Sequence, residues 1–188
     1  LGYHLLPWQK YKPHPPHGRA KPWLPMLTSR GCPMHCNYCS HGVFGNRFNA
    51  QSPSRVVDEM SYLQGRFGVK EIAFYDDVFT LNKDRAYRIA DEILKRNLKI
   101  CWTCETRADL VDRELLERIS QSGCSSISYG IESGSQEILD IVGKGITLEK
   151  SEEAVRLTRE SGIQTIGYFM IGSPHETPET IRQTIDFA

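Results

Sequence analysis

The run Ile163-Gln164-Thr165-Ile166-Gly167-Tyr168-Phe169-Met170-Ile171 is almost unbroken in its apolar character, and Thr177-Pro178-Glu179 follows shortly after it. A capping threonine followed by proline at the first helical position is typical of a helix start. A continuous apolar run of this length is typical of a parallel strand covered on both faces. The stretch therefore predicts a strand followed by a helix, the unit from which α/β folds are built.

Four further units of this kind precede it along the chain. The expected strands lie near 24–28, 69–75, 99–104 and 124–131, and the expected helices near 54–67, 83–96, 113–121, 135–142 and 148–160. Strands that alternate with helices indicate a parallel sheet with crossover helices. The predicted fold class is α/β, and its architecture is either an open doubly wound sheet or a whole or partial barrel.

The two ends of the chain differ from its middle. Residues 1–23 hold five of the ten prolines, which predicts an extended Pro-rich linker from a missing N-terminal region. Residues 24–188 form the predicted core domain. The chain ends at Phe187-Ala188, barely inside its last expected helix, so we expect a piece of a longer protein, truncated after about five strand-helix units.

Composition and charge exclude several classes of protein. The 188 residues are 39% hydrophobic and carry 23 basic and 23 acidic side chains, values that rule out a disordered chain and give no whole-chain reason to expect nucleic acid or an anionic membrane as a partner. No stretch approaches the roughly 20 apolar residues of a membrane span. The first residues lack a secretion signal. We therefore expect a cytoplasmic protein.

The sharpest local signal is a cluster of cysteines after the first expected strand. It reads Thr28-Ser29-Arg30-Gly31-Cys32-Pro33-Met34-His35-Cys36-Asn37-Tyr38-Cys39-Ser40. Three thiolates on one loop can converge on one centre, and soft sulfur ligands select iron–sulfur clusters, zinc or Cu(I). Because three ligands are one short of closure, a four-iron cluster held here would keep one iron free for a further ligand.

Two alternatives to an open cluster remain at this point. A zinc-stabilised binding module would take its fourth ligand from His35, His41 or a distant cysteine, although zinc sites usually come as two ligand pairs. Cys101 and Cys104 offer a pair, but positions three apart on a strand point to opposite faces. A non-catalytic iron–sulfur electron-transfer protein would need four cysteine ligands. The three later cysteines are otherwise expected to be small buried hydrophobic residues.

The cysteine motif resembles that of the radical S-adenosylmethionine (radical SAM) enzymes, in which Cys-x3-Cys-x2-Cys follows the first strand of a partial (β/α)6 barrel. The resemblance spans roughly residues 24–188. The runs 74–80, 129–134 and 167–177 resemble the subgroup that carries an N-terminal cobalamin-binding domain. That subgroup includes the anaerobic oxidative cyclase of Mg-protoporphyrin IX monomethyl ester and many class B methyltransferases.

The resemblance implies an activity and its cofactors. Cys32, Cys36 and Cys39 would hold a [4Fe-4S] cluster, and its free iron would chelate the amine and carboxylate of SAM. One electron, from a reductant such as flavodoxin or ferredoxin, would then release a 5′-deoxyadenosyl radical. The implied reaction is methyl transfer or oxidative ring closure on a tetrapyrrole. The substrate would be a small molecule, and cobalamin would come from a domain outside this chain.

The same resemblance assigns cofactor contacts to residues at the carboxyl ends of the strands, where barrel folds place their sites. They are Tyr38 and Ile171 for adenine, Asp76 and Asp77 for the amine through backbone oxygens, Glu132 or Ser133 for ribose, and Gly172 on the adenine side. The family usually has Gly-Gly-Glu where this chain has Asp76-Asp77. Glu105 and Arg107 are two residues apart and face the same way, and a guanidinium can grip a carboxylate at two points.

Each of these residues also has a purely structural alternative. Asp76 and Asp77 could cap the following helix. Arg107 could form a surface ion pair with Asp109. Ser135 is a better helix cap than Glu132, and Glu176 could orient the loop before Thr177. The joint position of these polar residues at one end of the sheet favours the functional interpretation, because unrelated polar residues would not gather there.

Overall fold

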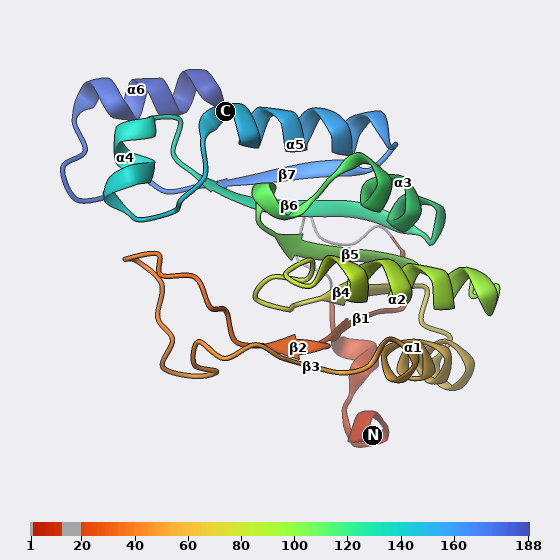
Figure 1. Cartoon of the computed structure of the whole chain (residues 1–188). Coiled ribbons are helices and arrows are strands. Elements are labelled where there is room, and N and C mark those ends of the chain that lie inside the picture. Colours follow the sequence, from red (N-terminus) through yellow and green to blue (C-terminus); the bar gives the residue numbers. More distant parts are fainter. Residues whose placement is uncertain (1, 13–19) are drawn as a thin grey trace.

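The computed structural model describes residues 2–12 and 20–188. Five parallel strands form one sheet in the order β1-β4-β5-β6-β7 (Figure 1). Because sheet neighbours follow one another along the chain, the order is that of a barrel wall, whereas a doubly wound sheet reverses at a switch point. The predicted α/β class is confirmed. The strands are β1 (Trp23–Met26), β4 (Glu71–Phe74), β5 (Cys101–Thr106), β6 (Cys124–Glu132) and β7 (Gln164–Phe169).

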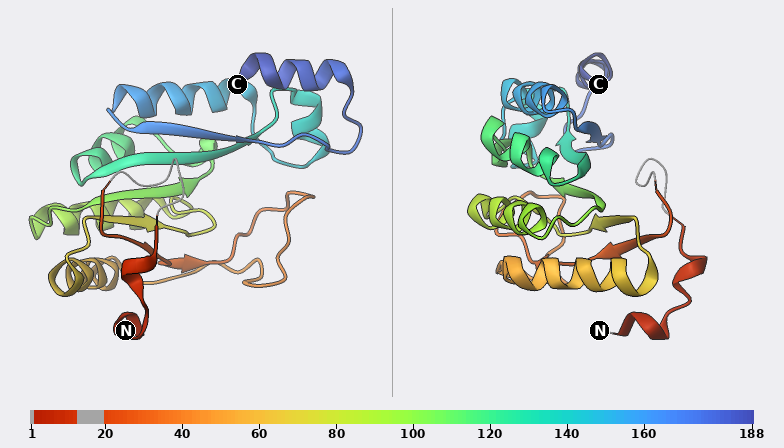
Figure 2. Two further views of the ribbon diagram at one scale, coloured as in Figure 1. Left: turned by 180° about the vertical axis from the view of Figure 1, so that it is seen from behind. Right: turned by 90° about the vertical axis from the view of Figure 1, so that its right-hand side faces the viewer.

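Helices pack in a row against this sheet, α1 on α2, α2 on α3 and α3 on α5. Figure 2 shows α2, α3 and α5 along one side of the strands.

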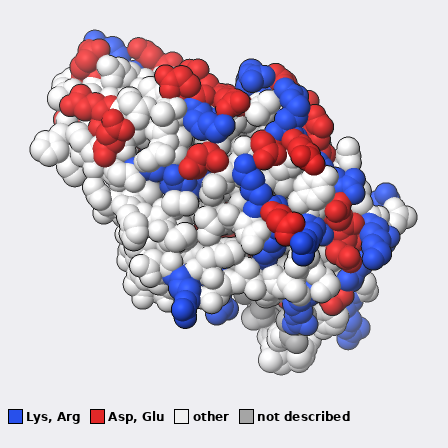
Figure 3. Space-filling model, in the orientation of Figure 1, with Lys and Arg blue, Asp and Glu red and all other residues white. Residues whose placement is uncertain are grey.

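None of the helices in the described residues combines the length and the apolar composition of a membrane crossing. Acidic and basic side chains share much of the face drawn in Figure 3. The helices are α1 (Pro53–Phe67), α2 (Lys83–Lys95), α3 (Arg113–Gln121), α4 (Gln136–Ile141), α5 (Leu148–Glu160) and α6 (Pro178–Phe187), with a short 3₁₀ turn η3 (Ala108–Leu110).

The helix ends follow the signals in the sequence. Ser52 Oγ accepts a hydrogen bond from the Arg55 amide, Pro53 opens α1, and Gly68 ends it in the left-handed region. Thr177 and Thr180 form a reciprocal capping box at the start of α6. The capping residues therefore fix the positions at which these helices begin.

The core contains an aromatic cluster between the sheet and its helices. The ring of Phe74 stacks on Phe79 at 4.9 Å, and Trp102 lies 5.4 Å from both rings. Cys104 and Cys124 are buried nearby, as expected for small hydrophobic residues. The expectation was wrong for Cys101, which is exposed because it occupies the first position of β5, at the sheet's open amino end.

Strand β7 departs from the prediction that it is covered on both faces. It ends at Phe169 rather than at residue 171, and its residues are half-buried or exposed. The physical reason is its place in the sheet, since β7 is the outer strand and pairs only with β6 among the described residues. Tyr168 on β7 and Ile171, two residues after the end of the strand, consequently remain accessible.

The N-terminal segment is partly ordered rather than extended. Residues Gly2–Leu5 and Trp8–Lys10 form two 3₁₀ turns, η1 and η2. Tyr3 Oη donates to Glu59 Oε1 of α1 at 2.8 Å, and the Trp8 ring meets an aromatic ring of α1 edge-on. The Pro-rich part, with His14 and His17, lies outside the described residues. The division of the chain at residues 23 and 24 stays a prediction.

A two-stranded hairpin closes the base of the cysteine segment and was not predicted. Strand β2 (Ser29–Arg30) pairs antiparallel with β3 (Asn49–Ala50), and we call the intervening residues 31–48 the cysteine loop. Gly31 has φ 85°, and a Cβ there would lie 2.2 Å from the Arg47 carbonyl oxygen, so only glycine fits. In Figure 1 this loop projects beyond the same end of the sheet as α4.

The close approach of α6 to the backbone of Gly134 provides a test of how tightly this helix packs. A Cβ at Gly134 would lie 2.5 Å from Phe187 Cβ and 2.6 Å from the Gln183 carbonyl oxygen. We expect Gly134→Ala to lower the free energy of unfolding by about 1–3 kcal/mol, because α6 has to move away. The matched control is Gly65→Ala within α1, because a Cβ added at Gly65 would have no atom within 4 Å. It should raise stability by about 0.5–1 kcal/mol. Urea unfolding of both variants measures the change in unfolding free energy. Equal changes in the two variants would contradict the packing of α6 against Gly134.

Candidate active site

A cavity of about 460 Å³ opens at the carboxyl ends of β4, β5 and β6. Parallel strands bring their carboxyl ends to one edge, so residues that are distant in sequence meet there. The volume is within the range typical of small-molecule and cofactor sites. The structure brings all three cysteines of the motif to this cavity, together with five other predicted residues, namely Tyr38, Asp77, Glu105, Arg107 and Glu132.

The three cysteines differ in their exposure. Cys36 is buried, Cys32 is half-buried and Cys39 is exposed. The pKa of the Cys39 thiol is raised, first because this thiol is partly buried and then because the sulfurs of Cys32 and Cys36 are close to it. Among the described residues, no three His, Cys, Asp or Glu side chains are grouped closely enough to hold a single metal ion. The thiols instead line the wall of a space much larger than one ion.

The middle of the cysteine loop is fixed to the end of α4. The Asn37 amide donates to the Val142 carbonyl at 2.9 Å, and Asn37 Nδ2 donates to the Ile141 carbonyl at 2.7 Å. These bonds also satisfy orphan carbonyls at the end of a short helix. Asn37 lies between Cys36 and Cys39, so the contact sets the position of both sulfur-bearing residues.

Arg107 connects the cysteine loop to the sheet edge. Its Nη1 lies 3.8 Å from Cys36 Sγ, and its Nη2 donates to the Lys144 carbonyl at 2.8 Å. The Nε and Nη2 atoms also grip the two carboxylate oxygens of Asp109 at 2.9 and 3.1 Å. The ion pair with Asp109 therefore exists, but Arg107 is buried and not on the surface. Its charge is directed at a cysteine sulfur.

Glu132 forms a buried polar cluster with Lys144 and Tyr38. Lys144 Nζ donates to Glu132 Oε1 at 2.9 Å and to Tyr38 Oη at 3.1 Å. Burial, followed by the Glu132 carboxylate and Cys36, raises the pKa of Tyr38, so its phenol stays protonated at physiological pH. Glu132 has φ 72°, a backbone conformation that costs free energy for a residue with a side chain. The register of β6 with β7 also shifts there.

Lys144 is a residue of this site that sequence reasoning missed. It is 7% exposed, lines the cavity and makes the contacts that hold Glu132 and Tyr38. The sequence feature that could have indicated Lys144 is its position between two glycines, Gly143 and Gly145. Both glycines have positive φ and form a tight turn after α4. A lone lysine on such a turn has no periodic pattern, and its burial depends on the fold.

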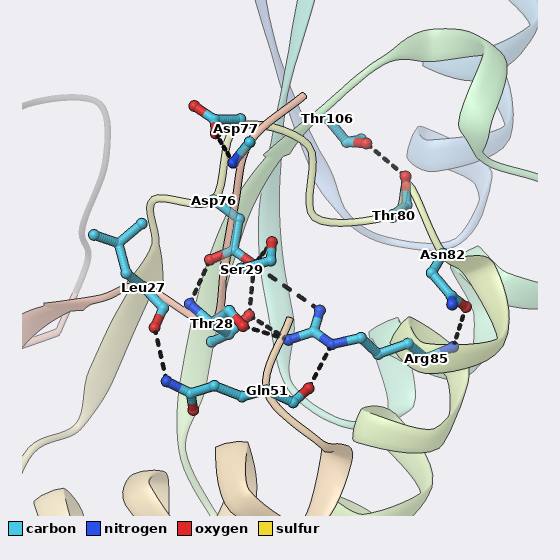
Figure 4. Close-up of polar contacts among 11 residues, drawn as sticks. Leu27, Thr28, Ser29, Gln51, Asp76, Asp77, Thr80, Asn82, Arg85 and Thr106 are labelled. Atoms are coloured by element: carbon cyan, nitrogen blue, oxygen red, sulfur yellow. Dashed lines mark hydrogen bonds and ion pairs between the residues drawn. The ribbon is translucent and has the colours of Figure 1, made fainter. Parts of the chain in front are cut away.

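Asp76 does not line the cavity, and its buried side chain belongs to a polar network instead (Figure 4). It accepts hydrogen bonds from the Thr28 amide at 2.6 Å, from Thr28 Oγ1 at 2.5 Å and from Ser29 Oγ at 2.6 Å. Arg85 of α2 lies beside it, with Nη1 at 3.9 Å from Asp76 Oδ2. Arg85 also donates to the Thr28 carbonyl and, through Nε, to the Gln51 carbonyl, each at 2.9 Å.

The network explains the acidic pair after β4. Asp76 holds the residues that enter the cysteine loop, while Asp77 Oδ2 accepts from the Gly31 amide at 2.8 Å. Neither aspartate caps α2, because Asn82 performs that role. The helix-cap alternative is therefore wrong. A contact between the backbone oxygens of this pair and the SAM amine stays a prediction.

Besides Asp76, three predicted residues lie outside the main cavity. Ser133 is buried, with its Oγ 3.0 Å from Thr184 Oγ1 of α6, so its hydroxyl is engaged elsewhere. Ile171 and Gly172 line a second cavity of about 510 Å³. Tyr38 lines both cavities and stands between them. Glu176 accepts from the amides of Gly172 and Ser173, which confirms that it orients the loop before α6.

Glu105 on β5 and Arg107, the residue directly after this strand, line the same cavity, as their spacing of two residues predicts. Tyr168 Oη of β7 donates to Glu105 Oε1 at 3.4 Å. Tyr168 was not among the predicted site residues. It reaches the cavity because β7 is the strand after β6 in the sheet, a neighbour that the sequence order alone does not fix.

The chain matches the family model of the Radical SAM superfamily over residues 26–188. It therefore belongs to the radical SAM superfamily. An uncharacterized methyltransferase of Pyrococcus horikoshii is 41% identical over 99% of this chain and 40% of its own length. The anaerobic magnesium-protoporphyrin IX monomethyl ester cyclase of Rubrivivax gelatinosus is 32% identical over 98% of this chain and 33% of its own length. The chain thus spans about two fifths or less of these relatives.

Solved structures agree with the family and the fold. The radical SAM methyltransferase TsrM of Kitasatospora setae, in complex with tryptophan and a SAM analogue, has a TM-score of 0.79 at 28% identity, covering 87% of this chain and 33% of that one. TsrM has also been solved with cobalamin and a [4Fe-4S] cluster bound. The cobalamin-dependent enzyme OxsB, at 24% identity and a TM-score of 0.77, supports the fold alone. The predicted partial barrel and the predicted enzyme family are confirmed.

The buried Asp76 network gives a test of stability. We expect Asp76→Ala to cost about 3–5 kcal/mol of unfolding free energy, because it leaves the buried charge of Arg85 and three donors without their acceptor. The control is Asp58→Ala, which removes an exposed partner of Arg96 and should cost at most about 1 kcal/mol. Chemical denaturation measures both values. A loss below 1 kcal/mol for Asp76→Ala would contradict this account.

Proposed function

We propose that this chain is the core of a radical SAM enzyme in which Cys32, Cys36 and Cys39 hold a [4Fe-4S] cluster and SAM binds beside them. The observation that supports the proposal most is the shared cavity, which three thiols line together with charged and polar side chains at the carboxyl ends of the strands. When bound, the cluster supplies the single electron that cleaves the SAM sulfonium and releases a 5′-deoxyadenosyl radical.

The number of thiols favours an open cluster over an electron carrier with four cysteine ligands. Cys101, Cys104 and Cys124 do not line the cavity, so three cysteines are available there. A cavity of about 460 Å³ also leaves room beside the thiols for a ligand of SAM's size, whereas a structural zinc site is closed by four ligands. The thiol count and the cavity volume thus both support a cluster with one iron left for SAM.

We assign the remaining roles in binding the cluster and SAM to other residues of the two cavities. Arg107 places a guanidinium at 3.8 Å from Cys36 Sγ, where it stabilises negative charge on that sulfur. Its bidentate grip is taken by Asp109, so we assign it to charge balance rather than to the SAM carboxylate. Lys144 holds the Glu132 carboxylate at 2.9 Å, and we assign Glu132 to accept hydrogen bonds from the ribose hydroxyls. Tyr38, Ile171 and Gly172 would enclose the adenine in the second cavity.

The reaction, the second cofactor and the setting of the whole protein belong to this proposal. Methyl transfer is supported by the similarity to methyltransferases, and oxidative ring closure on a tetrapyrrole is supported by the similarity to the cyclase. We propose that cobalamin is held by a domain outside this chain and that the substrate is a small molecule. The electron comes from flavodoxin or ferredoxin in the cytoplasm, where the six free cysteines stay reduced.

Substitution of one ligand tests the proposal. Anaerobic reconstitution of the full-length protein should bind about four irons per chain and give a brown colour. Cys36→Ala should lose the colour and the formation of 5′-deoxyadenosine, because two thiolates cannot hold the cluster. The matched control is Cys101→Ala, which changes an exposed cysteine at the opposite end of β5 and should keep both. Iron analysis and product chromatography decide, and full iron content in Cys36→Ala would refute the ligand assignment.

A further inference from the structure

The inner face of the sheet, turned away from α2, α3 and α5, carries polar side chains toward the main cavity (Figure 2). Side chains alternate between the two faces of a strand, and Cys104 of β5 and Ile127 of β6 belong to the core on the helix side. Their neighbours Glu105 and Ser128 therefore lie on the inner face, where they stand opposite each other in the β5–β6 register. Both line the cavity that the three cysteines share.

Glu105 and Ser128 lie deeper in the barrel than the residues proposed to hold the cluster and SAM. Glu105 comes two positions before Arg107, and Ser128 comes two positions before Gly130 on β6. Two residues span about 6–7 Å along a strand. Arg107 places its guanidinium 3.8 Å from Cys36 Sγ, so the cysteine loop lies nearer to the strand ends. Glu105 and Ser128 thus form the floor of the cavity.

Tyrosines from the two flanking strands approach the Glu105 carboxylate. Tyr168 Oη of β7 donates to Glu105 Oε1 at 3.4 Å and therefore reaches across β6. Burial is the main reason that the pKa of Tyr168 is raised; a hydrogen bond with Ser128 lowers it, and the charge of Glu105 raises it further. Burial and then Glu105 also raise the pKa of Tyr75, the residue directly after β4. Both phenols stay protonated at physiological pH and bring aromatic rings to the carboxylate.

The floor of the cavity is acidic in character. Arg107 and Lys144 also line the cavity, but Arg107 grips Asp109 at 2.9 and 3.1 Å, and Lys144 donates to Glu132 at 2.9 Å. A carboxylate beside aromatic rings suits a protonated amine, because the carboxylate forms a charge-assisted hydrogen bond and the rings add cation–π attraction. The floor therefore favours a ligand with a positively charged nitrogen.

The cysteine loop gives the same cavity an apolar wall. Met34, Val43 and Phe44 of this loop line it. Val43 is 84% exposed, so its side chain is available to an occupant of the cavity. Burying such groups against a ligand is favourable, because it removes apolar surface from water. A ligand with an amine at one end and an apolar body at the other matches both surfaces.

We propose that Glu105, with Tyr75 and Tyr168 beside it, binds a protonated amine of the substrate, and that the apolar wall receives the substrate's body. This inference rests on the proposed function, since it names the class of small molecule that the cavity accepts together with SAM. SAM also carries an amine, but the expected contact of that group is the backbone of Asp76-Asp77 at the strand end. The deeper position of Glu105 favours the substrate as its partner.

Calorimetric titration with three related probes tests the amine site. 2-Phenylethylamine is protonated at neutral pH, 3-phenylpropionate has nearly the same shape with a negative charge, and 2-phenylethanol is uncharged. We expect the full-length wild-type protein to bind the amine with a roughly millimolar dissociation constant, and the other two probes at least about tenfold more weakly. Glu105→Gln keeps the size of the side chain and should weaken amine binding about tenfold. Tyr168→Phe keeps the ring and should weaken it about threefold.

A control variant and a second ligand complete the experiment. Glu114→Gln removes an exposed carboxylate of α3, on the helix side of the sheet, and should leave amine binding unchanged. The affinity of the reconstituted protein for SAM should be the same in Glu105→Gln as in the wild type. Weaker SAM binding in Glu105→Gln would assign this carboxylate to SAM and overturn the substrate site.

Three further results would also overturn the amine site. They are a wild type that binds the three probes equally or binds none of them, unchanged amine affinity in Glu105→Gln, and equal weakening in Glu114→Gln. Failure of the wild type to bind iron would instead refute the proposed function. Titration of the cluster-free protein with the amine would still decide the present inference.

Discussion

The buried carboxylate of Asp76 is the contact on which the geometry of the site depends. It joins the end of β4 to the chain leaving β1, through hydrogen bonds to both Thr28 and Ser29. Arg85 compensates the charge and adds bonds to Thr28 and Gln51, so α2 and the segment before α1 are included. Both sides of the β2–β3 hairpin are thus fixed to the sheet. Buried ion pairs rarely add net stability, but they do favour one arrangement of their neighbours.

This constraint gives the cysteine loop two fixed regions and one free region. Its base is held by the hairpin and the Asp76 network, and its middle is held by Asn37 on the end of α4. The residues around Val43 have no such anchoring contacts, and Val43 and Phe44 are exposed while they line the cavity. A loop built this way can keep its sulfur-bearing residues in place while its tip forms a less constrained wall of the same cavity. Rigid support of a site by packed neighbours is what precise positioning of a cofactor requires.

Sequence reasoning predicted the repeating elements and the cysteine motif well, because both are encoded locally. Apolar periodicity and capping residues such as Ser52 and Thr177 are read from a few neighbouring positions. The exposure of β7 was mispredicted because burial depends on which strand stands at the sheet edge. Lys144 and the side-chain role of Asp76 were missed for a related reason. Their partners lie 12 to 106 positions away, so only the fold shows them.

Glu132 shows how the site and the fold constrain each other. Its left-handed backbone costs free energy, and a non-glycine residue keeps such a conformation only where its surroundings over-determine it. Here Lys144 holds the carboxylate, and the Glu132 carbonyl accepts from the Met170 amide at 2.8 Å, which ties β6 to the residues after β7. A glycine would relieve the strain but would remove the carboxylate. The strained backbone of Glu132 thus marks the same position that the proposed ribose contact assigns a role to, and the Lys144 contact is what holds it there.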